Sequence, residues 1–114
     1  MSMDLEVWSE NPFDLESILD KYDQWDKYGD ELSYEGDGWQ VTINLDMPDQ
    51  PPNAVIEKIS SAKYVAYTSI EPIGADANGY RFFEETVRAL ARGSEGLWVD
   101  AYGEVFSPNE GSFY

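Results

Sequence analysis

Several residue types on which catalytic and metal sites depend are missing from this sequence. None of its 114 residues is a cysteine or a histidine. Without cysteine there is no disulfide framework, no thiolate nucleophile and no thiolate metal site. Without histidine, the commonest general base and the commonest transition-metal ligand are absent. We therefore expect a protein that holds no metal or cofactor and is not an enzyme.

Long apolar runs are also missing. No stretch approaches the ~18 apolar residues that a membrane span requires, and the first residues, Met-Ser-Met-Asp, lack the basic and apolar regions of a signal peptide. Aromatic residues make up 15% of the chain and apolar residues 42%, which argues against disorder. We expect a single cytoplasmic domain over residues 1–114 that does not bind membranes.

Positive charge is scarce and unevenly placed. The chain has 23 acidic residues against seven basic ones, a net charge of −16. Residues 1–50 account for −12 of it and residues 51–114 for −4. Such a field repels nucleic acid and anionic lipid and attracts a basic protein surface, so we expect a basic protein partner and no direct nucleic-acid binding. The alternative is that the acids serve only solubility.

The clearest local signals of secondary structure lie in the second half of the chain. Residues 63–71 are mostly β-branched, aromatic or small, with apolar side chains on both alternating faces, which predicts a central strand covered on both faces. A turn at Pro72-Ile73-Gly74 precedes a helix predicted over residues 76–92. Asp76 is its expected N-cap and Gly93 its expected left-handed C-cap.

The rest of the chain is expected to alternate between short strands and helices. In the first half we predict a strand over Met3–Ser9, a helix that begins after Asn11 and ends at Gly29, and a hairpin over residues 32–46 that turns at Gly36-Asp37-Gly38. An irregular loop over 47–53 and a short helix over 54–61 follow, with Val55, Ile56 and Ile59 of that helix pointing inward. After the helix over 76–92 we predict a hairpin over 97–106 and a tail held by Phe113 and Tyr114. The fold class is therefore α+β, a mainly antiparallel sheet with helices on one face. The first six elements follow a ferredoxin-like split βαβ order, and a further helix and hairpin follow at the C-terminal end.

No arrangement of carboxylates predicts catalysis or a calcium site. Adjacent acids such as Glu84 and Glu85, or Asp30 and Glu31, diverge on a helix or strand instead of converging on one substrate. The acids between residues 20 and 30 do not match the ligand positions of an EF-hand loop. We interpret these residues as surface acids.

Acids and aromatic residues of the first 40 positions are the candidate partner-binding residues. Trp8 and Tyr28 lie off the predicted apolar faces and are expected to be exposed anchors, since interfaces favour aromatic centres with charged rims. The full candidate set is Trp8, Glu16, Asp20, Asp23, Asp26, Tyr28, Asp30, Glu35 and Asp37.

Three stretches carry a resemblance to a known class of proteins: Ile70-Glu71-Pro72-Ile73-Gly74-Ala75, Gly79-Tyr80-Arg81-Phe82-Phe83 and Gly96-Leu97-Trp98-Val99-Asp100. With the small size and acidic charge, they resemble immunity proteins of bacterial polymorphic-toxin and contact-dependent inhibition systems. The resemblance implies a stoichiometric, non-catalytic inhibitor that occludes a basic cognate toxin domain, often a nuclease.

Two other functions remain open at this point. A phage-type DNA mimic that inhibits a nucleic-acid enzyme would need the acids at DNA-like spacing on one surface. A small-ligand module or carboxylate-dependent enzyme would need a deep pocket lined by Tyr64, Tyr67 and Trp98 with a buried acid.

Overall fold

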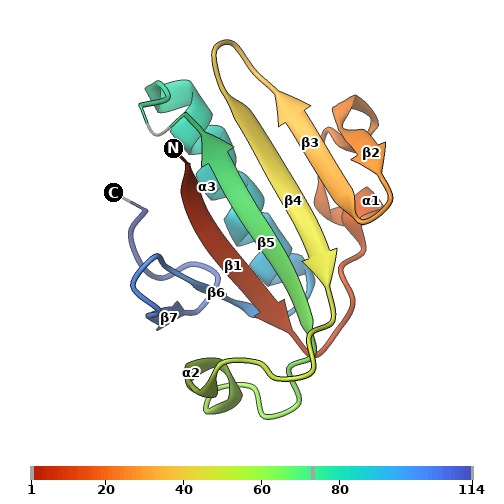
Figure 1. Cartoon of the computed structure of the whole chain (residues 1–114), viewed down its shortest axis with the longest axis vertical. Helices are drawn as coiled ribbons and strands as arrows, with labels where there is room; N and C mark the ends of the chain where they lie inside the picture. The colour runs from red at the N-terminus through yellow and green to blue at the C-terminus, as the bar shows by residue number, and fades with distance from the viewer. Residues whose placement is uncertain (1, 73, 114) are drawn as a thin grey trace.

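The computed structural model describes residues 2–72 and 74–113 and shows an α+β fold built on one open, seven-stranded sheet (Figure 1). The strands are β1 (Met3–Ser9), β2 (Asp26–Tyr28), β3 (Glu31–Glu35), β4 (Gln40–Asp46), β5 (Tyr64–Glu71), β6 (Leu97–Val99) and β7 (Val105–Phe106). The helices are α1 (Leu15–Ile18), the 3-10 helix η1 (Tyr22–Gln24), α2 (Asn53–Ile56) and α3 (Ala77–Gly93). Strand order is β2-β3-β4-β5-β1-β6-β7, with every neighbouring pair antiparallel. The expected fold class is confirmed.

The main core lies between α3 and one face of the sheet. Helix α3 buries Phe83, Val87 and Leu90 from one side, as the helical spacing predicts. They pack in one cluster with inward-facing strand residues, among them Val7 of β1 and Ile43 of β4. Because β1 pairs with β5 on one side and β6 on the other, strands from the beginning and the end of the sequence lie side by side against α3.

The predicted N-cap of α3 forms, but the predicted C-cap does not. Its start is confirmed: the Asp76 carboxylate accepts a hydrogen bond from the backbone N–H of Gly79 at 3.0 Å. The expected left-handed Gly93 is wrong, because Gly93 is the last helical residue and Glu95 takes the positive φ of 56°. A Cβ on Gly93 would lie 2.5 Å from Ile18 Cγ1, so this glycine is explained by close approach of α1 to α3.

The ferredoxin-like order is not confirmed. In a ferredoxin-like sheet the first strand lies between the third and the fourth, so β1 would pair with both β4 and β5. Here β1 pairs antiparallel with β5 on one side and with β6 on the other. The chain between residues 10 and 25 leads instead to β2, at the far edge of the sheet.

The long helix expected between Asn11 and Gly29 is wrong. Only α1 and η1 form there, and residues 26–28 pair with β3 as a strand. The ammonium group of Lys27 donates hydrogen bonds to the carbonyl oxygens of Tyr22 (2.9 Å) and Trp25 (3.0 Å), which takes up acceptors that a continuing helix would use. Four aspartates between residues 14 and 26 also favour turns over helix interior.

A second, smaller core lies on the other face of the sheet at one end. It contains Trp8, Val55, Ala62, Val65, Leu97 and Val99. Trp8 is only 2% exposed, so its expected role as an exposed anchor is wrong: α2 and the turns after it cover the ring. The expected helix over residues 54–61 is shorter than predicted, and of its inward-pointing residues Val55 is buried but Ile56 is 39% exposed.

The remaining expectations divide between confirmed and corrected ones. The hairpin over residues 32–46, the hairpin over 97–106 and the irregular loop after Asp46 are confirmed. Strand β5 is central but is covered on both faces only near Val65, since Tyr67 is 38% exposed. Phe113 is buried and holds the tail as expected. Ile73 of the expected turn and Tyr114 of the tail lie outside the described residues.

Candidate binding surface

The helices leave one face of the sheet largely uncovered. In Figure 1 the strands lie in front of α3, and this face is turned toward the reader. Strand register places on it Asp4, Glu6 and Trp8 of β1; Asp26 and Tyr28 of β2; Glu31, Ser33 and Glu35 of β3; Gln40, Thr42, Asn44 and Asp46 of β4; Val65, Tyr67, Ser69 and Glu71 of β5; Leu97 and Val99 of β6; and Val105 of β7. The small core around Trp8 covers one end. We call the uncovered remainder the open face.

Acidic side chains surround the open face, and none of its strand positions holds a lysine or arginine. The seven acids are Asp4, Glu6, Asp26, Glu31, Glu35, Asp46 and Glu71. Its centre is uncharged: the hydroxyls of Thr42 and Ser69 share a hydrogen bond of 2.6 Å, with Ser33 and Asn44 beside them. From β2 to β1 the face is roughly 19 Å wide at the usual strand spacing. It is a broad surface with a charged rim and a neutral polar centre.

No lysine or arginine lies on a strand position of the open face. Lys21, Lys27, Arg81, Arg88 and Arg92 belong to the helix-covered side, and Lys58 and Lys63 to the segment between α2 and β5. Among the described residues the only ion pair joins Arg88 to Glu84, at 3.0 Å. The acids of the open face are therefore not neutralised by cations of the same chain, and their field points outward.

A hollow of about 610 Å³ marks the β1–β5 part of the open face. Its lining includes Asp4, Glu6, Tyr67, Ser69 and Asp100. Hydrogen bonds position two of the carboxylates: Ser2 Oγ donates to Asp4 Oδ1 at 2.8 Å, and the indole N–H of Trp8 donates to Glu6 Oε1 at 2.8 Å. Carboxylates held in this way lose little freedom when a cation approaches.

The electrostatics of the hollow act on Tyr67. Burial raises the pKa of the Tyr67 hydroxyl above its ordinary value, and the nearby negative charges of Glu6 and Asp46 raise it further. The phenol therefore stays protonated and remains a hydrogen-bond donor next to the acids. It is an exposed aromatic ring surrounded by negative charge, an arrangement that favours a cationic ligand group.

The structure separates the predicted partner-binding residues instead of collecting them. Asp26, Tyr28 and Glu35 lie on the open face. Glu16, Asp20 and Asp23 lie on the exposed side of the α1–η1 segment, Asp30 in the β2–β3 turn and Asp37 in the β3–β4 turn. All seven of these acids are exposed, and Tyr28 is 85% exposed as expected. The acidic helix face that would have joined them does not exist, because the helix does not form.

Several members of the open face were not singled out from the sequence. Asp4, Glu6, Glu31, Asp46 and Glu71 all belong to it. The signal was present in the period-two alternation of Met3–Ser9 and Gln40–Asp46, where acids and other polar residues share one side. What the sequence does not contain is the register that aligns those sides across strands.

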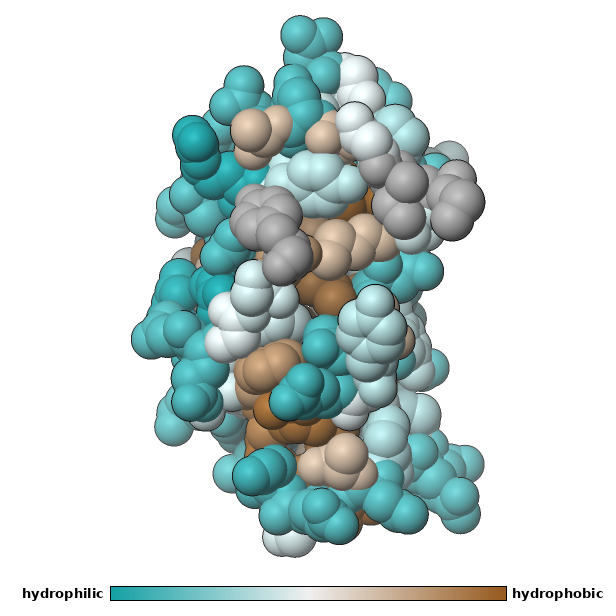
Figure 2. All heavy atoms as spheres, turned by 90° about the vertical axis from the view of Figure 1, so that its left-hand side faces the viewer, coloured by the Kyte–Doolittle hydropathy of each residue, from teal (hydrophilic) through white to brown (hydrophobic). Residues whose placement is uncertain are grey.

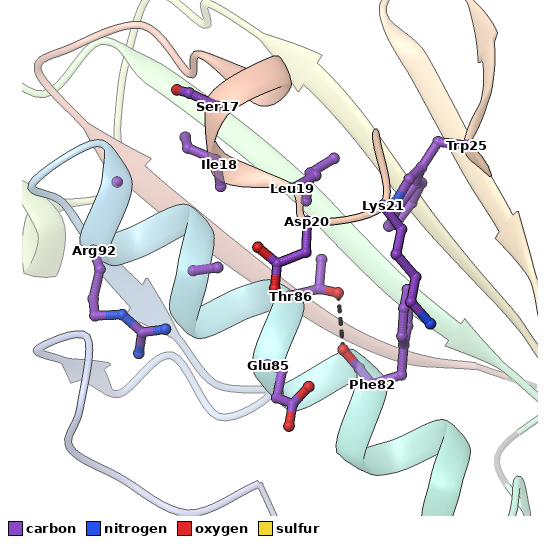
Figure 3. A pocket seen from close by; sticks show the side chains of 12 residues that line it. Ser17, Ile18, Leu19, Asp20, Lys21, Trp25, Phe82, Glu85, Thr86 and Arg92 are labelled. Carbon is purple, nitrogen blue, oxygen red and sulfur yellow. Dashed lines mark hydrogen bonds between the residues drawn. The ribbon is translucent and has the colours of Figure 1, made fainter. Parts of the chain in front are cut away.

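A second depression lies between the α1–η1 segment and α3 (Figure 3). It has a volume of about 790 Å³. Two acids, Asp20 and Glu85, and two cations, Lys21 and Arg92, line it together with the rings of Trp25 and Phe82 and several small residues. In Figure 3 Asp20 points into this groove toward Thr86, and Lys21 extends along the Phe82 ring. Its charges balance, so the groove selects no sign of ligand.

The pocket expected for a small-ligand function does not form among the described residues. Trp98 is fully buried in the main core, whereas Tyr67 lies on the opposite, open face. Within residues 2–72 and 74–113, no group of three or more acids is placed to hold a metal ion. No described helix has both the length and the apolar character to cross a bilayer.

Comparisons with known proteins found no relative: no family model, no curated protein and no solved structure matches this chain.

Proposed function

We propose that this chain is a non-catalytic binding protein that neutralises a basic protein partner by covering it with the open face. The observation that carries the proposal is the distribution of charge on that face. Seven acids surround it, none of its strand positions is basic, and no described ion pair involves it. A surface of one sign attracts a partner of the other and repels wrong partners.

The layout of the face suits protein recognition better than small-molecule binding. Stable interfaces place aromatic and neutral polar groups at the centre and charges at the rim. Here the hydroxyl pair of Thr42 and Ser69 and the ring of Tyr67 occupy the centre, and carboxylates occupy the rim. Lysine or arginine side chains of a partner would meet the rim while the neutral centre packs against backbone and short side chains.

We further propose that the partner is a cognate toxin domain and that the chain acts as its immunity protein. A nuclease toxin carries a basic surface for its own substrate, and an acidic cover of this width blocks it. The stretches that resemble immunity proteins include the end of β5, part of α3 and β6, which are scaffold elements of the sheet and its covering helix. The DNA-mimic alternative stays a second candidate, and the activity of the captured partner separates the two, because a DNA mimic would retain a nucleic-acid enzyme of the host in place of a toxin.

The test is capture of partners from the source cell at low salt, followed by elution with a salt gradient. The matched control is a variant with Asp4→Asn, Glu6→Gln, Asp26→Asn and Glu35→Gln, which removes acids from both ends of the open face. One stoichiometric basic protein, retained by the native chain, lost by the variant and inhibited in its own activity, supports the proposal. Equal capture by both chains, or elution insensitive to salt, contradicts it, because exposed charges are screened over about 8 Å at physiological ionic strength.

A further inference from the structure

The turn between β6 and β7 presents the most exposed aromatic ring among the described residues. Tyr102 at its tip is 95% exposed. One carboxylate oxygen of Asp100 accepts hydrogen bonds from the backbone N–H groups of Tyr102 and Glu104, both at 2.9 Å. Asp100 N–H donates to the Glu104 carbonyl at 3.0 Å, and Gly103 supplies the positive φ of 83° that the turn needs. The ring therefore projects from a turn with little freedom to lose.

The same turn forms one wall of the hollow on the open face. Asp100 and Ala101 line it together with Asp4, Glu6 and Tyr67. Continuing the antiparallel register of β6 beyond Val99, which pairs with Glu6, brings Ala101 level with Asp4. Tyr102 directly follows Ala101 in this turn, and the carboxylates of Asp4 and Glu6 in the same hollow are already positioned by Ser2 and Trp8.

The side of the molecule that carries the β6–β7 turn has little hydrophobic surface for binding. Figure 2 shows the side that holds β6, β7 and the N-terminal end of the chain: hydrophilic surface dominates, and hydrophobic surface forms a narrow, interrupted strip. A partner here must be held mainly by charge and by individual aromatic anchors. Tyrosine is a frequent anchor because it offers a large amphipathic contact at low entropic cost.

We propose that the hollow and the β6–β7 turn are the centre of contact on the open face, where an arginine or lysine of the basic partner enters between Asp4, Glu6 and Tyr67 and packs against Tyr102. This inference rests on the proposed function. It deepens that function by placing the contact at the β1–β6 end of the face, away from Asp26, Tyr28 and Glu35 at the other end. The occupant is a basic protein segment.

The test uses a blocked hexa-arginine peptide as the probe and the full chain in solution at low salt. Backbone amide shifts in nuclear magnetic resonance locate the bound peptide, and calorimetry gives its affinity. Two double variants remove equal charge from opposite ends of the face: Asp4→Asn with Glu6→Gln, and Asp26→Asn with Glu35→Gln. Glutamine at position 6 keeps an oxygen for the Trp8 indole. Tyr102→Ala is compared with Tyr28→Ala, a second exposed tyrosine beside a turn.

We expect the largest shifts at Asp4, Glu6, Tyr67 and the turn over residues 100–104. The first double variant should weaken binding about tenfold and the second about twofold, as expected for partly exposed ion pairs. Tyr102→Ala should weaken binding about threefold, the size of an exposed cation–π contact, and Tyr28→Ala less than twofold.

Two outcomes overturn the inference, and they are distinguishable. Shifts centred on β2 and β3, with the second double variant the more damaging, refute the hollow as the contact centre but leave the proposed function standing. Shifts spread equally over acids of both sides of the molecule, or centred on the α1–α3 groove, refute both, because then the open face has no preference for a cation. Circular dichroism of every variant confirms that it is folded.

Discussion

Tyr67 is the titratable side chain that reports directly on the field of the open face. Its pKa is raised first by burial and then by Glu6 and Asp46. We expect the ring-carbon resonance of Tyr67 to titrate at a pH above the ordinary tyrosine pKa of about 10. Glu6→Gln should move the Tyr67 midpoint toward the ordinary value of about 10. An unchanged midpoint in that variant would show that Glu6 does not contribute to the raised pKa of Tyr67.

The same shift makes a prediction about stability in alkaline solution. The folded-state pKa of Tyr67 lies above the unfolded value, so at high pH the folded chain holds its proton more tightly than the unfolded chain. Its contribution to stability is therefore fully present below pH of about 10 and is lost as the pH rises through the folded value. In Tyr67→Phe this part of the alkaline loss should disappear.

Two glycines give a matched test of close packing. A Cβ at Gly96 would overlap the backbone carbonyl oxygen of Trp8 and lie 2.9 Å from Ser94 Oγ, at the point where β6 joins β1. A Cβ at Gly74 would meet no heavy atom within 4 Å. We expect Gly96→Ala to lower the free energy of unfolding by about 2 kcal/mol and Gly74→Ala to change it by less than about 1 kcal/mol. Urea unfolding measures both, and equal effects would contradict the packing at Gly96.

Single residues also show where sequence periodicity loses information. Trp8 alternates with the apolar side of β1, so periodicity predicts that it faces solvent. In the structure it is covered by α2, which begins 45 positions further along the chain. Periodicity reports which residues share a side of a strand; it does not report whether a distant segment covers that side. Periodicity also does not indicate the exposure of Tyr102, because this residue lies at the tip of a turn shaped by hydrogen bonds to Asp100 and is 95% exposed there.

At the scale of elements, Arg88 makes most of the hydrogen bonds that join the C-terminal tail to α3, and Arg92 adds one to Asn109. Arg88 donates hydrogen bonds to the carbonyl oxygens of Pro108 (2.9 Å), Glu110 (2.8 Å) and Gly111 (2.9 Å). Its guanidinium group also lies 5.0 Å from the centre of the Phe113 ring. The planar fork of Arg88 carries its donors on separate nitrogens, Nη1 for Pro108 and Glu110 and Nη2 for Gly111, whereas a lysine has a single ammonium nitrogen.

We therefore expect Arg88→Ala to lower the free energy of unfolding by about 2–3 kcal/mol, with at least half of that loss in Arg88→Lys. Hydrogen exchange should show that amides of residues 107–113 lose protection first. Arg81→Ala, an exposed arginine on the same helix, is the control and should change stability by less than about 0.5 kcal/mol. A tail that stays protected in Arg88→Ala would show that its other contacts, Phe113 and the hydrogen bond from the Trp98 indole to the Glu110 carbonyl (3.1 Å) among them, are enough to hold it.

The contrast between two expected helices explains how much of the fold was predictable. In α3 the N-cap, the apolar stripe and the helix-forming residues all agree, and the helix forms within one residue of the prediction. Between Asn11 and Gly29 the stripe is present but many residues favour turns, and the β3 edge offers residues 26–28 a strand partner. When local signals conflict, a tertiary partner decides the outcome.

At the scale of the whole molecule, the sequence shows the amount of charge but not its sidedness. The net charge of −16 can be read from composition alone. That the acids of four central strands and the β2 edge share one face follows only from register, which pairs Asp4 with Ser69, Ser69 with Thr42 and Thr42 with Ser33. Because these acids are concentrated on one face, the negative charge of the chain produces a directional field.

That concentration predicts how stability depends on salt. Neighbouring acids of the open face lie roughly 7–10 Å apart by strand geometry. They repel one another at 0.01 M salt, where the Debye length is about 30 Å, but this repulsion is screened near 1 M, where the Debye length is about 3 Å. We expect the free energy of unfolding to rise by about 1 kcal/mol over that range.

Neutralising Asp26, Glu31, Glu35 and Glu71 should remove most of this rise. Neutralising Glu16, Asp20, Asp49 and Glu57, which are exposed but lie off the open face, gives the same net charge and should remove much less. If the two variants show the same salt dependence, net charge alone sets the repulsion, and the open face holds no concentrated field with which to attract a partner.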